Sequence, residues 1–145
     1  MNLRNASLTG YFILVVSLVL LVVRNAIFAS GIIPIAVQGM SVALMVWART
    51  TFGRRSFHAG ADPTRGGLVT TGPYKYIRHP IYASILYFMW AAVYSSPADI
   101  NIFLGITGTL GLSLRIYSEE KLIVEQYPQY TEYARGTKRV IPYLF

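Results

Sequence analysis

Apolar residues are concentrated in four long runs, at positions 10–29, 31–48, 81–95 and 100–117. A helix that crosses a bilayer needs about 20 mainly apolar residues, which the first, second and fourth runs approach and the shorter third run does not reach. The connections between the first and second runs and between the third and fourth are very short. The pattern therefore predicts an all-α integral membrane protein with four transmembrane helices arranged as two hairpins.

The first run also has features of a secretory signal peptide, because Arg4 precedes it. A cleavage pattern of small residues is poor around Ala29 and Ser30, however, and another apolar run follows at once. A retained helix is the favoured interpretation.

Composition supports a membrane protein of one domain, residues 1–145. Hydrophobic residues make up 54% of the chain and charged residues only 13%, against about 25% charged in typical soluble domains. The chain has no cysteine, and its two histidines, His58 and His79, lie far apart. No group of residues has the spacing of a metal site, so no metal is predicted.

Lysine and arginine are concentrated on one predicted side of the membrane. They occur between the two hairpins and after the fourth run, whereas Arg24 alone lies toward the opposite side. The residues in the first group are Arg49, Arg54, Arg55, Arg65, Lys75 and Arg78, and those in the second are Lys121, Arg135, Lys138 and Arg139. This asymmetry predicts that both termini and the 49–80 loop are cytoplasmic, in a membrane of the bacterial inner-membrane type. The net charge of +7 then favours anionic lipid headgroups over nucleic acid as a partner.

Two features of the apolar runs restrict the function. No Asp or Glu falls inside any run, which argues against a proton-coupled carrier. The fourth run has small residues at four-residue spacing, which favours close helix packing. These are Gly105, Thr109 and Ser113, with Gly108 and Gly111 near the same stripe.

The segment before the third run combines cations with a helix start. Pro80 suits the first turn of a helix, so the helix is expected to begin at His79 or Pro80. Arg78, His79 and the exposed N–H groups then gather at a helix N-terminus, which favours anions. The alternative is a simple membrane anchor on the positively charged side.

Two adjacent acids stand near the end of the fourth run. Glu120 shares a helix face with Ile116, Ile123 and Tyr127, and Glu119 lies four residues after Arg115. Burying a carboxylate is costly without a cationic partner, which a ligand could supply. The alternative is a surface pair of Arg115 and Glu119, with Glu120 in solvent.

The last segment predicts a short interfacial helix that starts at Pro128 and ends at Gly136. Tyrosines recur every three residues at 127, 130 and 133. Together with Lys138 and Arg139, they fit a helix with tyrosines at headgroup depth and cations on lipid phosphates.

Two stretches together resemble a known family. LVTTGPYKYIRHPIYAS, residues 68–84, resembles the signature GPY-x-x-x-RHP-x-Y of the isoprenylcysteine carboxyl methyltransferases. The tail, with Glu119-Glu120, the Tyr127-Pro128 and Tyr130/Tyr133 pattern and Arg139-Val140-Ile141-Pro142, resembles that family's C-terminal region. Phospholipid N-methyltransferases share the broad pattern. The resemblance covers about residues 66–145, and Ser84 stands where a glycine is common.

The resemblance implies an integral membrane methyltransferase that uses S-adenosylmethionine. The 66–145 region, with its cytoplasmic loop and C-terminal interfacial helices, would form the cofactor pocket. The residues that would line or shape this pocket are Tyr74, His79, Pro80, Tyr82, Glu119 and Glu120. Arg78 or Arg115 could hold an acceptor carboxylate or phosphate.

The acceptor would be lipophilic and most closely a carboxylate of the isoprenylcysteine type, which needs no general base. A phospholipid amine is the alternative acceptor, for which His79 is the candidate base. A non-catalytic membrane scaffold or small transporter that retains the fold is the third alternative.

Overall fold

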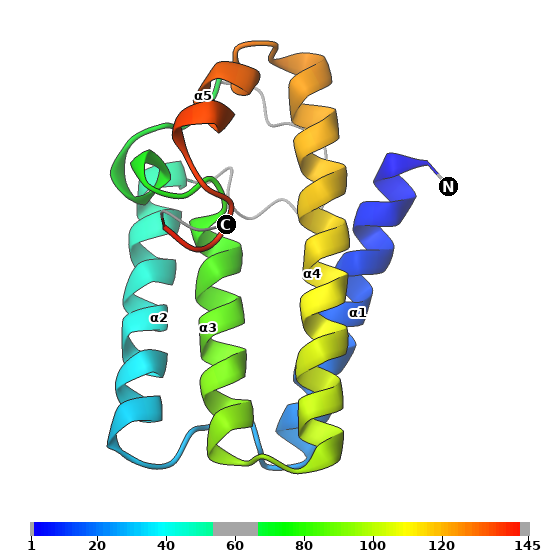
Figure 1. The fold of residues 1–145 in the computed structure, drawn as a ribbon, viewed down its shortest axis with the longest axis vertical. Helices are drawn as coiled ribbons and strands as arrows, with labels where there is room; N and C mark the ends of the chain where they lie inside the picture. The colour runs from blue at the N-terminus through cyan, green and yellow to red at the C-terminus, as the bar shows by residue number, and fades with distance from the viewer. Residues whose placement is uncertain (1, 54–66, 143–145) are drawn as a thin grey trace.

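The structure is a computed structural model and describes residues 2–53 and 67–142. These residues form five α-helices and one 3₁₀ turn without any β-strand, as the all-α prediction requires (Figure 1). The helices are α1 (Leu3–Val23), α2 (Ile32–Phe52), α3 (Pro80–Ser95), α4 (Asp99–Gln126) and α5 (Tyr130–Gly136), and the turn is η2 (Gly72–Lys75). The prediction for the central loop concerns Arg54, Arg55, His58 and Arg65, which lie outside the described residues.

Helix α1 ends earlier than the apolar run predicts. Asn25 has a φ of 52°, in the left-handed region that Asn tolerates better than most residues. Its N–H bonds to the Val22 carbonyl and the Ala26 N–H to the Leu21 carbonyl. These two bonds form a Schellman motif, and Leu21 and Ala26 supply its buried apolar contact. The predicted extension to residue 29 is therefore wrong, because backbone geometry ends the helix while the sequence is still apolar.

Helix α3 starts as the sequence predicts. His79 is its N-cap and Pro80 its first residue, where the missing N–H costs no hydrogen bond. The predicted short helix after Pro128 is also present as α5, and it ends at Gly136.

Three of the described helices, α1, α2 and α4, are long and apolar enough to cross a membrane. Helix α3 has 16 residues, fewer than a full crossing needs. Helix α4 continues to Gln126, well beyond the predicted end at residue 117. Glu119 and Glu120 therefore lie on the same rigid helix as the apolar run, which fixes their direction relative to the bundle.

The helices pack as α1 with α4 and α2 with α3, and these pairs lie side by side in Figure 1. The expected pairings of the first run with the second and of the third with the fourth are therefore not the main contacts. Gly10 and Gly111 explain the α1–α4 pair, because a Cβ at Gly10 would lie 2.4 Å from the Gly111 carbonyl oxygen. Close packing through small residues of α4 is confirmed, with Gly111 facing α1, Gly105 facing α3, and Gly108 packed between Met89 of α3 and Ser17 of α1.

The α1–α2 connection is fixed at the end of the bundle opposite α5. Arg24 donates from Nε to Asn101 Oδ1 at 2.8 Å. Gln38 accepts from the Ala29 N–H and donates to the carbonyls of Ile27 and Phe88. Ile27 and Ala29 lie between α1 and α2, so Gln38 satisfies backbone groups that have no partner within a helix. The opposite end of the bundle is left for the segments that carry the sequence motifs.

Candidate functional site

The segment after α5 lies alongside the residues that precede α3. Ile77 and Lys138 form an isolated parallel bridge. The N–H of Arg78 donates to the Lys138 carbonyl at 2.7 Å, and the N–H of His79 donates to the Arg139 carbonyl at 2.9 Å. The two stretches that carry the sequence resemblance are therefore joined directly by backbone hydrogen bonds.

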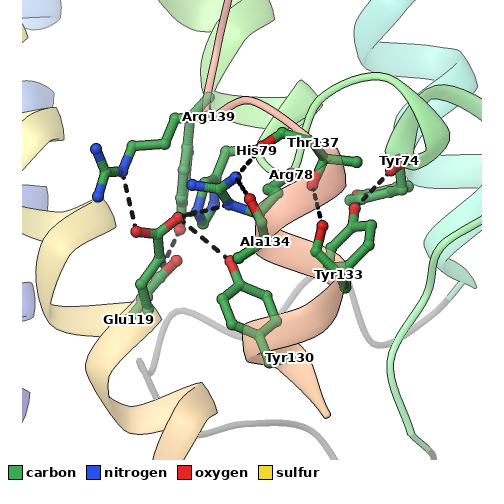
Figure 2. A network of polar contacts seen from close by, with 11 residues as sticks. Tyr74, Arg78, His79, Glu119, Tyr130, Tyr133, Ala134, Thr137 and Arg139 are labelled. Atoms are coloured by element: carbon green, nitrogen blue, oxygen red, sulfur yellow. Dashed lines mark hydrogen bonds and ion pairs between the residues drawn. The ribbon is translucent and has the colours of Figure 1, made fainter. Parts of the chain in front are cut away.

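Glu120 is the centre of a polar network at this junction, whose members Arg78, His79, Tyr130 and Arg139 are labelled in Figure 2. Its Oε1 accepts from Arg78 Nε at 2.9 Å and lies 3.3 Å from His79 Nε2 and from the Tyr130 hydroxyl. Its Oε2 accepts from Arg139 Nε at 2.9 Å. The network joins α4, α5, the start of α3 and the segment after α5 around one carboxylate.

Arg78 also binds the end of α5. Its NH1 donates to the carbonyls of Ala134 and Thr137, which lie at the last turn of that helix and just after it. A guanidinium is well suited to this position, because terminal helix carbonyls have no partner within the helix. Only 8% of the Arg78 side chain is exposed. Arg78 therefore holds α5 onto α4 through its Nε and NH1 donors.

Glu119 belongs to a second group on the side of α4 that faces α1 and α3. Its Oε1 accepts from Arg115 NH2 at 2.9 Å and from the Tyr82 hydroxyl at 2.6 Å. Arg115 Nε donates in turn to the Tyr82 hydroxyl at 2.7 Å. The Arg115 guanidinium lies over the rings of Tyr11 and Tyr82, at 4.7 and 5.7 Å from their centroids. Arg115 is only 3% exposed, so its pair with Glu119 is buried and the alternative of a surface pair is wrong.

The two acids have protein cations at contact distance. The sequence interpretation left Glu120 either in solvent or neutralised by a ligand. The solvent alternative is wrong, because Arg78 and Arg139 contact Glu120 and its side chain is only 13% exposed. Contact of Glu120 with a ligand stays a prediction. The sequence missed these partners because they lie 42 and 19 residues away along the chain.

Tyr74 lies apart from the two glutamates. Its ring centroid is 5.5 Å from that of Phe52 at the end of α2, and its carbonyl accepts from the Tyr133 hydroxyl. Burial raises the pKa of Tyr74, and burial likewise raises the pKa of Tyr133 to about 12. Both phenols are therefore protonated at neutral pH. The remaining predicted pocket residues, His79, Pro80 and Tyr82, are grouped with the glutamates, and the rings of His79 and Tyr82 stack with centroids 5.6 Å apart.

The last segment differs from the interfacial helix that the sequence predicts. Tyr130 is 4% exposed and contacts Glu120, and Arg139 binds Glu120. These two residues belong to the site and were not among the predicted site residues. Both residues belong to the C-terminal stretch that resembles the family, Arg139 in the Arg139–Pro142 motif and Tyr130 in the Tyr130/Tyr133 pattern. The three-residue spacing of the tyrosines nevertheless suggested a position at the lipid headgroups.

A mainly apolar cavity of about 400 Å³ borders the network. It lies between α3, α4 and the segment after α5, and Arg139 forms part of its wall. The lining residues are Leu86, Thr109, Leu112, Ser113, Ile116, Tyr117, Arg139, Val140 and Ile141. Its volume falls within the range of about 300–1,000 Å³ that small-molecule sites occupy. An apolar cavity thus meets a charged network at the end of the bundle that carries the motifs.

Comparison with known proteins agrees with this arrangement. A model of the phospholipid methyltransferase family matches residues 26–130, which is well over half of the chain. The chain belongs to this family. Membership makes it a membrane protein of a methyltransferase family, consistent with its three long apolar helices. The narrower isoprenylcysteine assignment stays a prediction.

Two curated proteins are similar to this chain over part of its length. The cobalt-zinc-cadmium resistance protein CzcN of Cupriavidus metallidurans is 30% identical over 78 residues, which is 53% of this chain and 36% of the relative. The nickel-cobalt-cadmium resistance protein NccN of Alcaligenes xylosoxydans xylosoxydans is 31% identical over 78 residues, which is 53% of this chain and 37% of the relative. The matches thus span little more than a third of each relative. No solved structure matches the chain.

Proposed function

We propose that this protein is a membrane methyltransferase that uses S-adenosylmethionine to methylate a lipophilic acceptor. The observation that carries the proposal is the meeting of the mainly apolar cavity with the Glu120 network, in a chain of the phospholipid methyltransferase family. A lipid acceptor and a water-soluble donor come from different phases. A site at the boundary of the apolar bundle can receive both.

The donor set at the site fits the cofactor. The amino-acid end of S-adenosylmethionine carries an ammonium and a carboxylate, so it needs hydrogen-bond acceptors and donors side by side. Glu119 and Glu120 supply the acceptors, and Arg139 and the start of α3 at His79 supply donors. The cofactor would bring a methyl group bound to a sulfonium, which the aromatic faces of Tyr82 and its neighbours can attract. Pro80 would shape this wall, and Tyr74 would act only from a distance.

The chain's own contribution is position and electrostatics. A carboxylate acceptor of the isoprenylcysteine type needs no deprotonation, so alignment within a water-poor site would supply most of the rate. The catalytic roles of Arg78 and Arg115 in holding the acceptor stay predictions, and the present contacts of both side chains point more to shaping the site. Placement of the site and both termini on the cytoplasmic side is part of the same proposal.

A phospholipid amine is the second candidate acceptor, which the family match favours. An amine must lose a proton during the reaction. His79 Nε2 lies 3.3 Å from Glu120 Oε1, and a carboxylate at this distance can orient the ring. This pair is the most suitable proton acceptor at the site.

Two measurements test the proposal on the full chain in one detergent. Titration calorimetry with S-adenosylhomocysteine should show saturable binding, which would be absent from a scaffold or transporter that only retains the fold. Incubation with a radiolabelled methyl donor should then label either N-acetyl-S-farnesylcysteine or phosphatidylethanolamine, which distinguishes carboxylate from amine chemistry. Absence of both binding and labelling, in protein that unfolds cooperatively, would contradict the function.

A further inference from the structure

Arg139 differs from the other arginines of the site in two ways. Its side chain is 38% exposed, compared with 8% for Arg78 and 4% for Arg115. It also lines the apolar cavity, while binding Glu120 through Nε. Arg139 is therefore shared between the network and the cavity, and it is the most accessible guanidinium of the three.

The cavity is elongated along α4, with Arg139 toward one end. Its lining residues on this helix run from Thr109 to Tyr117, which is about 12 Å at 1.5 Å per residue. Glu120 lies one turn beyond Tyr117, so the charged network is at that end. Trp90 Nε1 donates to the Thr109 hydroxyl at 3.0 Å, which marks the other end.

The hydroxyls of Thr109 and Ser113 in the cavity wall already have hydrogen-bond partners within α4, so they do not require polar groups from a ligand. The hydroxyls of Thr109 and Ser113 donate to the carbonyls of Gly105 and Thr109, one turn back along α4. Most other lining side chains are aliphatic. A hydrocarbon chain is suited to such a wall, because it fills the volume without leaving a polar group of its own unpaired.

Releasing Arg139 toward a ligand would not isolate Glu120. The carboxylate would keep Arg78 at 2.9 Å, with His79 and Tyr130 at 3.3 Å. Arg139, the most exposed guanidinium of the network, could therefore bind an anion at the cavity end. Arg78 could not leave Glu120 to bind a ligand in the same way, because it also donates to the last carbonyls of α5.

We propose that Arg139 holds the anionic group of the acceptor, whose hydrocarbon chain lies in the cavity between α3 and α4 and ends near Thr109. This inference rests on the proposed function and deepens it by naming an acceptor class: an amphiphile with a carboxylate or phosphate at the head of an apolar chain. A guanidinium binds either anion through paired N–H donors.

The head-group test compares charged and neutral ligands of equal chain length, measured by calorimetry with the full chain in one detergent. One pair is N-acetyl-S-farnesylcysteine and its methyl ester, and the other is a lysophosphatidate and the monoacylglycerol of the same chain. Arg139→Gln should weaken binding of the charged member of at least one pair by roughly tenfold and leave its neutral partner unchanged. The pair that responds identifies carboxylate or phosphate as the head group.

Arg135→Gln is the matched control, because Arg135 is exposed on α5. Arg139→Lys keeps the positive charge and should retain most of the preference for the charged ligand over the neutral one. This variant can be measured even if Arg139→Gln proves too unstable. Equal losses for charged and neutral ligands would mean that Arg139 acts only on the fold, and unchanged binding would mean that it does not touch the acceptor. Either result overturns the inference. S-adenosylhomocysteine affinity of the wild type, measured alongside, separates this failure from failure of the methyltransferase function.

The position of the ligand's hydrocarbon chain is tested by a substitution that fills the cavity. Ser113→Leu places apolar atoms in the wall and should weaken the farnesyl ligand several-fold more than the shorter geranyl analogue. Leu110→Phe is the control, because Leu110 is 64% exposed and does not line the cavity. A loss independent of chain length would place the hydrocarbon elsewhere.

Discussion

Arg78 and Glu120 are separated by 42 positions in the sequence, and Arg78 Nε lies 2.9 Å from Glu120 Oε1. The pair joins the start of α3 to the far end of α4, two helices that otherwise make only limited contact. The same carboxylate holds Arg139 and Tyr130. The charged network is therefore part of what assembles the site as well as a candidate for binding within it.

The first prediction concerns this structural role. Glu120→Gln keeps the size of the side chain but removes the counter-charge of Arg78 and Arg139. The free energy of unfolding should fall by about 1–3 kcal/mol, because two guanidiniums lose a charged partner. Thermal unfolding in detergent measures this, with Glu125→Gln as an exposed control on the same helix. Equal unfolding midpoints for wild type and Glu120→Gln would exclude the role.

The second prediction concerns cofactor binding. Glu119→Gln and Glu120→Gln should each weaken S-adenosylhomocysteine binding, and at least one should do so by roughly tenfold to a hundredfold, the effect of losing a charge-assisted hydrogen bond. Affinity is measured by calorimetry below the unfolding midpoint of each variant, so that loss of fold does not count as loss of binding. Wild-type affinity in both variants would remove the acids from the cofactor site.

The third prediction concerns Tyr82, whose hydroxyl connects Arg115 with Glu119. Tyr82→Phe keeps the ring stacked on His79 and removes only the hydroxyl. We expect a loss of about 1.5–3 kcal/mol in unfolding free energy, typical of hydrogen bonds to charged groups. Tyr94→Phe is the control at a 76% exposed tyrosine. A similar small effect in both variants would show that the hydroxyl of Tyr82 contributes nothing to stability.

The fourth prediction concerns the α1–α4 contact. An alanine at Gly10 would place its Cβ 2.4 Å from the Gly111 carbonyl oxygen, so the helices must separate. Gly10→Ala should therefore destabilise by about 1–3 kcal/mol, the usual cost of overpacking. Gly39→Ala is the control, because its Cβ would have no neighbour within 4 Å and alanine favours a helix by about 1 kcal/mol. Gly10→Ala with wild-type thermal stability would contradict the close approach.

The fifth prediction concerns orientation. The chain lacks cysteine, so single cysteines can be placed without background labelling. Lys75→Cys, at the end of the bundle that carries the site, should react only with a reagent on the cytoplasmic side. Ala98→Cys, in the connection between α3 and α4, should react only from the opposite side. Reversed labelling of the two positions would invert the proposed topology.

The sequence by itself determined the helical class, the start of α3 at Pro80 and the small residues that let α4 pack closely. Each of these depends on local chemistry: the length of an apolar run, the missing N–H of proline, or the absence of a side chain. It also identified the two motifs of the site, whose broad family the comparison with known proteins confirms. The end of α1 could not be predicted from the apolar pattern, because Asn25 closes a Schellman motif while the surrounding residues are still apolar.

Only the tertiary structure decided which charges meet. Glu119 pairs with Arg115, which lies one helix turn earlier, and sequence spacing predicts such a pair. Glu120 found Arg78, His79 and Arg139 through the alignment of residues 77–79 with the segment after α5, which no local pattern encodes. The strength of an ion pair depends on distance and burial, and both are set here by how α3, α4 and α5 pack against one another. Neither quantity can be read from the order of residues along the chain.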